Sequence, residues 1–245
     1  MFNRLAIGFF ALIVFAGLAS QPREPVLVLA ELFTSEGCNS CPPADELLQV
    51  LLDEQPVSGV VVVPLSEHVT YWDHQGWKDP FSAQQFTVRQ QQYGLRFNLD
   101  SIYTPQLIID GAMEFVGSDR RAIERGLQAL ARSPKPQLTI NAVGTQTIDV
   151  TAAGPGLSVE RDAELFFVLA EDRLSVDVKR GENANKTLTH SGVVRLLRSS
   201  GNARADATTT MALDPAWHRE RLRVVGFVQS RKDRKILSVG FTRLP

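Results

Sequence analysis

Two different patterns of hydrophobic and polar residues divide the chain. In the first half, nearly continuous apolar runs at Pro25 to Phe33 and Gly59 to Leu65 are typical of strands that are buried on both faces. Between and after these runs, apolar residues recur at helical spacing. The sequence therefore predicts the element order β-α-β-α-β-β-α. Its remaining elements are expected at Ala44 to Leu52 (helix), Phe81 to Tyr93 (helix), Gln106 to Ile109 (strand), Ala112 to Val116 (strand) and Ser118 to Ala131 (helix).

The second half consists of short runs separated by turns, and helical spacing is scarce there. This pattern favours an antiparallel β-sandwich. Ser133 to Pro136 is a short, stiff linker. We therefore expect an α/β domain over residues 24–133, followed by a mostly antiparallel, sandwich-like module over residues 137–245. Its predicted strands are Gln137 to Val143, Thr147 to Ala152, Ala163 to Ala170, Leu174 to Val178, Val193 to Leu197, Thr208 to Leu213, Leu222 to Ser230 and Ile236 to Thr242.

The charges of the chain are nearly balanced. The 245 residues include 26 Lys+Arg and 27 Asp+Glu, which gives a formal net charge of −1. This balance excludes a polybasic protein that binds nucleic acid by counterion release, so we expect no nucleic-acid partner. Two cysteines are too few for a disulfide-rich scaffold, and apolar burial must therefore supply the core.

Residues 1–19 have the layout of a secretory signal peptide. Arg4 precedes an uncharged apolar run from Leu5 to Leu18, and the small residues Gly17 and Ala19 suit a cleavage site after Ala19. The alternative is an uncleaved membrane anchor, but the run is shorter than the ~20 residues that a spanning helix needs. We expect a periplasmic or secreted chain with no membrane span after cleavage, in a compartment where disulfides persist.

The two cysteines form the most specific motif in the sequence. Cys38 and Cys41 follow a buried strand and stand at the start of a helix. Unpaired amides and the partial positive charge of a helix N-terminus favour a thiolate at Cys38, and thiolates are the attacking species in disulfide exchange. Cys41, one turn further on and partly buried, is then placed to attack the mixed disulfide. The spacing predicts a redox pair that needs no cofactor.

Other interpretations of the pair lead to different functions. A structural disulfide of this spacing closes too small a loop to remove much chain entropy. A c-type haem attachment needs a histidine where Pro42 stands. A zinc site would need two further ligands, and we expect no metal. The candidate ligands would be carboxylates or the four histidines, His68, His74, His190 and His218.

Thr104-Pro105 begins the strand that follows the second predicted helix. We expect this peptide bond to be cis, although most X-Pro bonds are trans. The backbone beside a cis bond at this place can pair with an extended substrate near the cysteines. Thr104 and Pro105 therefore join the candidate site, Pro105 as the residue that aligns the substrate.

At these residues the chain resembles the thioredoxin-like superfamily, through Cys-X-X-Cys-Pro and the Thr-Pro before a strand. It is more closely similar to a bacterial family of secreted, thioredoxin-like proteins of unknown function, DUF1223. The resemblance implies a thioredoxin-like fold followed by a C-terminal β module, and it implies no substrate. The segments that carry it are Glu31 to Asp45, Tyr71 to Asp73, Gly76 to Phe81, Tyr103 to Gln106 and Arg180 to Asn183.

Glu31 and His68 are candidates for proton handling. Thioredoxins carry a buried acid on the strand before the motif, and the resemblance makes Glu31 the candidate for this role. Glu31 lies one residue further from Cys38 than that acid does, and one extra residue can turn a strand side chain to the other face. His68 follows the second strand and is a candidate proton carrier, with a structural histidine as the alternative.

The loop after the second strand is unusually aromatic. Trp72 and Trp77 are candidates for a substrate-binding lip near the cysteines, and the alternative is a loop that packs its own aromatic residues. Glu36, two residues before the first cysteine, is expected to be solvated. The charged turn from Lys179 to Asn183 is also expected to be solvated. The alternative is a site between the two parts of the chain, which Lys186 and His190 would help to line.

The sequence as a whole predicts a secreted or periplasmic thiol–disulfide oxidoreductase. Cys38 is the expected nucleophile and Cys41 the resolving thiol. The expected partners are a protein or small-molecule thiol or disulfide and an unidentified redox partner. The C-terminal module holds no cysteine and is expected to bind or present the substrate. The alternative function is a non-catalytic binding protein that keeps the fold with an inert disulfide.

Overall fold

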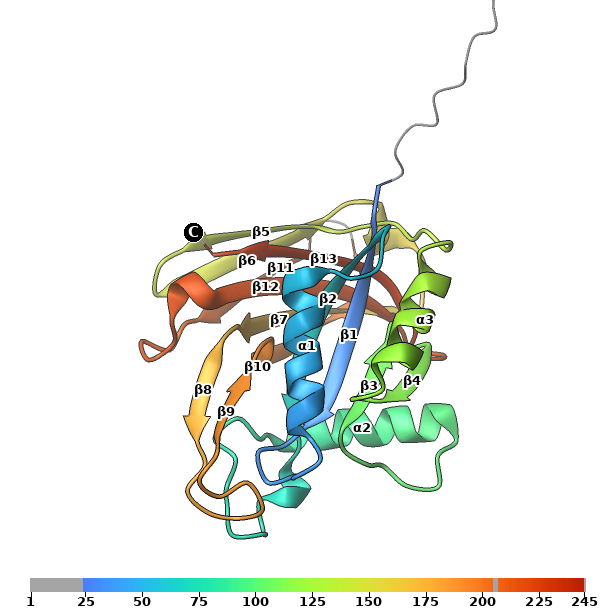
Figure 1. The fold of residues 1–245 in the computed structure, drawn as a ribbon. Coiled ribbons are helices and arrows are strands. Elements are labelled where there is room, and N and C mark those ends of the chain that lie inside the picture. The colour runs from blue at the N-terminus through green and yellow to red at the C-terminus, as the bar shows by residue number, and fades with distance from the viewer. Residues whose placement is uncertain (1–23, 205–206, 245) are drawn as a thin grey trace, which may run out of the picture.

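The computed structural model describes residues 24–204 and 207–244. Within these residues the strands form sheets of eight, three and two strands (Figure 1). The α-helices are α1 (Pro42–Glu54), α2 (Gln84–Phe97) and α3 (Arg120–Leu130). The strands are β1 (Val26–Thr34), β2 (Val60–His68), β3 (Gln106–Ile109), β4 (Met113–Val116), β5 (Thr139–Gly144), β6 (Thr147–Ala153), β7 (Ala163–Glu171), β8 (Leu174–Asp177), β9 (Thr187–His190), β10 (Val193–Asn202), β11 (Ala207–Ala212), β12 (Leu222–Ser230) and β13 (Ile236–Arg243).

The signal peptide predicted for residues 1–19 lies outside the described residues. Among the helices of residues 24–204 and 207–244, none combines the length and the apolar character needed to cross a bilayer.

The eight-stranded sheet runs in the order β13-β12-β7-β10-β2-β1-β3-β4. β1 and β2 pair in parallel from Val26 opposite Val60 to Thr34 opposite His68. β3 runs antiparallel to β1, and β4 antiparallel to β3. From β1 to α3, the α-helices and strands follow the predicted order β-α-β-α-β-β-α.

Alternation along β1 divides its side chains between two layers. Val28 and Leu32 pack against α1 and α3 on one face of the sheet. Leu29 packs on the opposite face with Phe86 of α2. Helices therefore cover both faces of β1 and β2, which explains why these strands have nearly continuous apolar sequences.

Local sequence signals set several element boundaries. Prolines occupy the first two positions of α1, where a missing amide hydrogen costs no helical hydrogen bond. The Asp119 carboxylate caps α3 and accepts from the Ala122 amide at 3.0 Å. Asp110 and Gly111 take positive φ in the turn between β3 and β4, as a tight-turn dipeptide does.

The second helix begins later than the sequence predicts. It was expected from Phe81, but α2 begins at Gln84. The Phe81 amide donates instead to the Asp79 carboxylate at 2.8 Å, which holds this residue in a turn. A side-chain bond of this kind competes with helix formation at a helix start.

The C-terminal half forms two packed β layers. The sheet β11-β6-β5 lies on the part of the large sheet that contains β7 and β12, and neighbouring strands in both layers are antiparallel. β9, which pairs with β8, is not among the strands that the sequence predicts. The side chains between the layers include Ile140, Ile148, Val150, Leu165, Phe167, Leu169, Met211 and Val224.

One sheet passes through both halves of the chain. β10 lies parallel to β2 through the pair Val193 and Ser66, and the Ser66 amide donates to the Gly192 carbonyl at 2.7 Å. Gly192 has a φ of 70°, and a Cβ there would lie 2.6 Å from the Pro64 carbonyl oxygen. Glycine is therefore required where the two halves meet.

A buried ion pair holds the same junction. Arg223 donates from Nε to the Asp172 carboxylate at 3.0 Å and from Nη2 to the Pro64 carbonyl at 2.6 Å. Asp172 also accepts from the Gly192 amide at 2.9 Å. Both side chains are buried, so each charge depends on the other for its neutralisation.

Apolar side chains from the two halves also share a cluster. It joins Leu29, Val63, Leu65 and Phe86 to Val168, Ala170, Val194, Val225, Phe227, Ile236 and Val239. The linker around Pro134 therefore connects two parts that share a sheet and an apolar core.

We expect Phe227→Ala to lower the free energy of unfolding by about 3–5 kcal/mol, because it leaves a cavity in this shared cluster. Urea unfolding followed by tryptophan fluorescence measures this, since Trp72 and Trp77 report on one half and Trp217 on the other. Phe241→Ala is the control on the neighbouring strand, since Phe241 is 39% exposed. Separate unfolding transitions for the two halves would contradict the shared core.

Candidate functional site

Cys38 and Cys41 form a disulfide where β1 leads into α1. Their Cα atoms are 5.4 Å apart, and Cys41 is the N-cap residue of α1. Cys41 was expected to be partly buried, but both cysteines are 0% exposed. Asn39 and Ser40 between them are exposed. The disulfide therefore lies directly beneath the surface, with its connecting residues in solvent.

Thr104 and Pro105 lie beside the motif, as the sequence interpretation requires. Their peptide bond is cis, as expected. A Cβ built on Gly117 would lie 3.1 Å from the Cβ atoms of both Ala44 and Pro105, so Pro105 is next to the first turn of α1.

Trp72 connects Thr104 to the motif. Its indole Nε1 donates to the Thr104 hydroxyl at 2.8 Å. A Cβ built on Gly37 would lie 3.0 Å from the Trp72 Cβ. This tryptophan therefore packs between the residue before Cys38 and the start of β3.

The second half of the chain reaches the motif through the β8–β9 loop, residues 178–186. The side-chain amide of Asn183 donates to the carbonyls of Glu36 and Cys38 at 2.8 and 2.9 Å. The Asn39 amide donates to the Glu182 carboxylate at 3.3 Å. The expectation that this charged turn is solvated is wrong at Asn183, which is fully buried. Its side-chain amide thus donates to two carbonyls of the motif loop, and the Cys38 carbonyl also accepts from the Cys41 amide at 3.2 Å.

The same loop packs on the aromatic segment. A Cβ built on Gly181 would lie 3.2 Å from both the Gln75 carbonyl oxygen and the Trp77 Cβ. The Trp77 Nε1 donates to the Glu36 carboxylate at 2.6 Å. Trp77 thus packs against the motif loop and the β8–β9 loop together.

Three charged side chains meet in the protein interior beside the disulfide. His190, at the end of β9, has Nε2 3.5 Å from Glu36 Oε1 and Nδ1 3.4 Å from Asp45 Oδ1. Asp45 lies in the first turn of α1 and accepts from the Thr34 hydroxyl at 3.1 Å. All of these side chains are buried, so the expectation that Glu36 is solvated is wrong. We call Glu36, His190 and Asp45 the buried triad.

His190 is held as an imidazolium by its neighbours. Burial alone lowers the pKa of His190, but the carboxylates of Asp45 and Glu36 outweigh it and raise this pKa to about 10. His190 therefore carries a positive charge at neutral pH.

His68 lies at the end of β2 and belongs to the same buried region. Its Nδ1 is 2.7 Å from the Asp79 carboxylate, and its ring lies edge-on to His190 with centroids 4.8 Å apart. Asp79 also accepts from the Glu36 amide at 2.8 Å. His68 is thus connected to the motif loop through Asp79, whose carboxylate contacts His68 and accepts from the Glu36 amide.

Several contacts act on the ionisation of Asp79. Burial raises its pKa, but the His68 charge, the His68 hydrogen bond and the amides of Glu36 and Phe81 together lower it to about 2. The ionised form of Asp79 is therefore the form that the fold stabilises.

Glu31 lies on the other face of the sheet. Its carboxylate accepts from Arg89 Nε at 2.5 Å and from the Tyr93 hydroxyl at 2.6 Å, both on α2. Glu67 lies on this face too, and burial together with the charge of Glu31 raises the pKa of Glu67 well above its ordinary value. Since α1 and the disulfide lie on the opposite face, the proton-handling role suggested for Glu31 finds no support. Side chains alternate along β1, and the position of Glu31 places it on the face away from α1.

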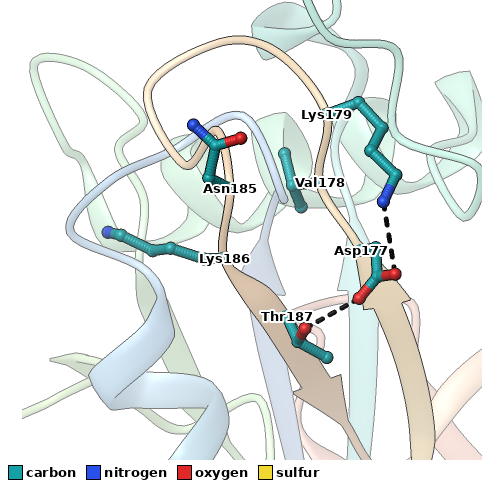
Figure 2. Close-up of a pocket in the computed structure, with 6 residues that line it drawn as sticks. All are labelled: Asp177, Val178, Lys179, Asn185, Lys186 and Thr187. Atoms are coloured by element: carbon teal, nitrogen blue, oxygen red, sulfur yellow. Dashed lines mark hydrogen bonds and ion pairs between the residues drawn. The ribbon is translucent and has the colours of Figure 1, made fainter.

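The surface next to the motif is hollowed on both sides of β9. One open hollow is lined by Asp177, Val178, Lys179, Asn185, Lys186 and Thr187 (Figure 2). Asp177 accepts from the Thr187 hydroxyl at 2.7 Å and from Lys179 Nζ at 3.2 Å, whereas the Lys186 side chain points away from them. A second hollow, between α1 and β9, is lined by Pro42, Asp45, Glu46, Thr187, Leu188 and Thr189. Charged groups of both signs thus line the two hollows beside β9.

Within residues 24–204 and 207–244, no group of three or more His, Cys, Asp or Glu side chains is arranged to hold a metal ion.

Sequence reasoning gave Asp45 no role, and it offered Asn183 and His190 only as part of an alternative site between the two parts of the chain. Asp45 carries a local signal, because it follows Cys41 by one helical turn and so shares its face of α1. Asn183 and His190 carry no such signal, since they lie about 150 residues further along the chain.

The sequence matches the family described as "Protein of unknown function (DUF1223)" over residues 29–229. No curated protein matches it. Among solved structures, a crystal structure of a protein from Agrobacterium tumefaciens is similar, with 24% identity and a TM-score of 0.69 over 90% of this chain and 95% of that one. HBP35 of Porphyromonas gingivalis has 14% identity and a TM-score of 0.62, over 91% and 77% of the two chains. At these identities the likeness concerns the fold alone.

We expect Asp79→Asn to lower the free energy of unfolding at pH 7 by about 2 kcal/mol. Folding depresses the pKa of Asp79, so its ionised form stabilises the protein above about pH 4, and this contribution is lost as the pH falls toward 2. Urea unfolding of the unaltered protein and of Asp79→Asn between pH 7 and pH 2 measures the difference in their free energies of unfolding. A difference that does not shrink with acidification would contradict this electrostatic explanation.

We expect Asn183→Ala to increase the rate at which dithiothreitol reduces the disulfide by at least about threefold. The variant leaves the carbonyls of Glu36 and Cys38 without their buried donor, which loosens the β8–β9 loop over the cysteines. Release of thiol groups over time measures the rate. Asn141→Ala, at an exposed position of β5, is the control and should behave like the unaltered protein.

Proposed function

This chain belongs to the DUF1223 family of proteins of unknown function, and we propose that it is a thiol–disulfide oxidoreductase that uses the Cys38–Cys41 pair. The observation that carries this proposal is the position of the disulfide. It closes the turn into α1, and the Thr104–Pro105 segment lies beside it. A short disulfide at a helix N-terminus is placed to stabilise a thiolate after reduction.

The topology of the first half supports a thioredoxin-like assignment. The strand order β2-β1-β3-β4, with β1 and β2 parallel and β3 antiparallel to β1, is the arrangement that this assignment requires. In such a fold the motif follows the first strand, and the proline precedes the third. Cys38 and Pro105 occupy these positions here.

The proposed reaction transfers two electrons between this pair and a substrate. In one direction, the Cys38 thiolate attacks a substrate disulfide, a new bond joins Cys38 to one substrate sulfur, and the other sulfur leaves as a thiolate that takes a proton from water. The Cys41 thiol then loses its proton and attacks Cys38, which releases the second substrate sulfur. The substrate is reduced, the pair is oxidised, and the reverse sequence oxidises a substrate dithiol. No cofactor takes part.

Access to the pair requires movement of the β8–β9 loop. Both cysteines are covered in the disulfide form, and Asn183 bonds directly to the Cys38 carbonyl. Opening of this loop joins the exposed segment Asn39–Ser40 to the hollows beside β9, which we propose as the surface that a protein substrate contacts.

We propose that the reaction takes place outside the cytoplasm, in the periplasm or the medium. The signal-peptide pattern at residues 1–19 supports this location. A second, unidentified redox partner then restores the pair after each turnover.

One observation favours a non-catalytic alternative. A disulfide whose two cysteines are 0% exposed is protected from attacking thiols, as an inert structural bond would be. In that case the hollows beside β9 would bind a partner without redox chemistry. Exchange with a buffer of reduced and oxidised glutathione separates the two functions, because the disulfide of an oxidoreductase must be reduced and re-formed in the native state while the inert disulfide must not.

For the oxidoreductase, we expect reduced Cys41→Ala to accumulate a mixed disulfide between Cys38 and glutathione. Attack survives in this variant, but the resolving thiol is gone. Reduced Cys38→Ala should form its mixed disulfide at least about tenfold more slowly, since the proposed attacking thiol is gone. Mass spectrometry of quenched samples measures both products. Equal trapping by the two variants would mean that the roles of the cysteines are misassigned.

A further inference from the structure

We propose that the buried triad of Glu36, His190 and Asp45 controls the stability of the Cys38 thiolate, with His190 as the positioning residue that supplies the stabilising charge. This inference rests on the proposed exchange function, because it concerns the same cysteine pair. It assigns a direct role in that chemistry to a residue from the second half of the chain.

The triad is attached to both sides of the disulfide. Glu36 precedes Cys38 by two residues, and Asp45 follows Cys41 by one turn of α1, with its amide donating to the Cys41 carbonyl at 3.2 Å. His190 bridges the two carboxylates from β9, at 3.5 and 3.4 Å. A charge on His190 therefore acts on the motif from a fixed position.

The surroundings of His190 leave these two carboxylates as its charge partners. β2 contributes His68, whose ring lies 4.8 Å from that of His190 and whose Nδ1 binds Asp79. The remaining ring neighbour is Phe81, at 5.9 Å. α1 contributes Asp45 and the motif loop contributes Glu36, while β8 places the apolar Leu174 opposite His190.

Burying three charges is not an efficient way to stabilise a fold. Each ion loses several kcal/mol of hydration free energy, and well-packed apolar side chains often replace such groups without loss of stability. Neither nitrogen of His190 makes a hydrogen bond of ordinary geometry here, so the contacts with Glu36 and Asp45 are mainly electrostatic. An arrangement of this kind next to a reactive pair indicates a chemical use.

The sign of each charge determines its effect on a thiolate. The imidazolium of His190 favours a negative charge on Cys38, whereas Glu36 and Asp45 disfavour it. With all three ionised, the triad carries one net negative charge. Loss of the His190 charge leaves two, and loss of either carboxylate leaves none. Substitutions within one buried cluster should therefore shift thiolate stability in opposite directions.

The test uses the full chain with Cys41→Ala, so that Cys38 is the single titrating cysteine. Thiolate absorbance at 240 nm, followed from pH 4 to 11, gives the pKa of Cys38 without requiring access for a reagent. Adding His190→Gln should raise this pKa by about one unit, which is a tenfold lower ratio of thiolate to thiol at pH values well below it. Adding Asp45→Asn instead should lower the pKa of Cys38, because it removes a negative charge. The asparagine keeps an acceptor for the Thr34 hydroxyl.

A matched control separates this effect from general loss of a histidine–carboxylate pair. His218 Nδ1 lies 2.9 Å from Glu171 Oε1, but His218 is about half exposed and makes no contact with the motif. His218→Gln should leave the Cys38 pKa unchanged. In the disulfide form, the NMR signals of the His190 ring should show an imidazolium up to at least about pH 8.

Opposite shifts for His190→Gln and Asp45→Asn support the proposal, because a merely structural role would move both in the same direction or neither. Equal or same-sign shifts, or a neutral His190 ring at pH 7, overturn it. These readouts do not depend on turnover. If the native protein does not exchange with a buffer of reduced and oxidised glutathione, the oxidoreductase is rejected and the electrostatic result stands. If it does exchange but the two variants show no opposite shifts, the role of the triad alone is rejected.

Discussion

The parallel pairing of β10 with β2 is the constraint on which the arrangement of the site depends. The contact is short, with Val193 opposite Ser66, but Gly192 permits the close approach and the buried Arg223–Asp172 pair fixes it. Since two residues, Ser191 and Gly192, separate β9 from β10, this pairing also determines where β9 and the β8–β9 loop lie. They are held against α1 and the cysteines, so the second half of the chain completes a site that the first half begins.

The disulfide is consequently surrounded by groups that come from distant parts of the chain. Asn183 satisfies the carbonyls of the motif, and His190 balances the carboxylates of Glu36 and Asp45. Because little water reaches this region, each of these contacts has a larger effect than it would at the surface. The same burial that strengthens the electrostatics also covers the cysteines, which links the reactivity proposed for the pair to movement of one loop.

The alternation of side chains along β1 separates two groups of buried acids. Glu31 faces α2, where Arg89 and Tyr93 bind it, and Thr34 faces α1, where it binds Asp45. A change of one position along a strand therefore decides whether an acid lies with the cysteines or across the sheet from them. Asp45 reaches the cysteines from the helix instead, and its place in the first turn of α1 fixes its distance from Cys41.

The sequence by itself determined the features that depend on neighbouring residues. Continuous apolar runs predicted β1 and β2, prolines and Asp119 marked helix starts, and the spacing of Cys38 and Cys41 predicted their pairing. It could not show that Glu36 is buried, that Glu31 faces away, or that Asn183 and His190 reach the motif. Those outcomes depend on which strands become neighbours across the sheet. Packing between residues far apart in the chain determines which strands become neighbours, and local periodicity cannot predict such packing.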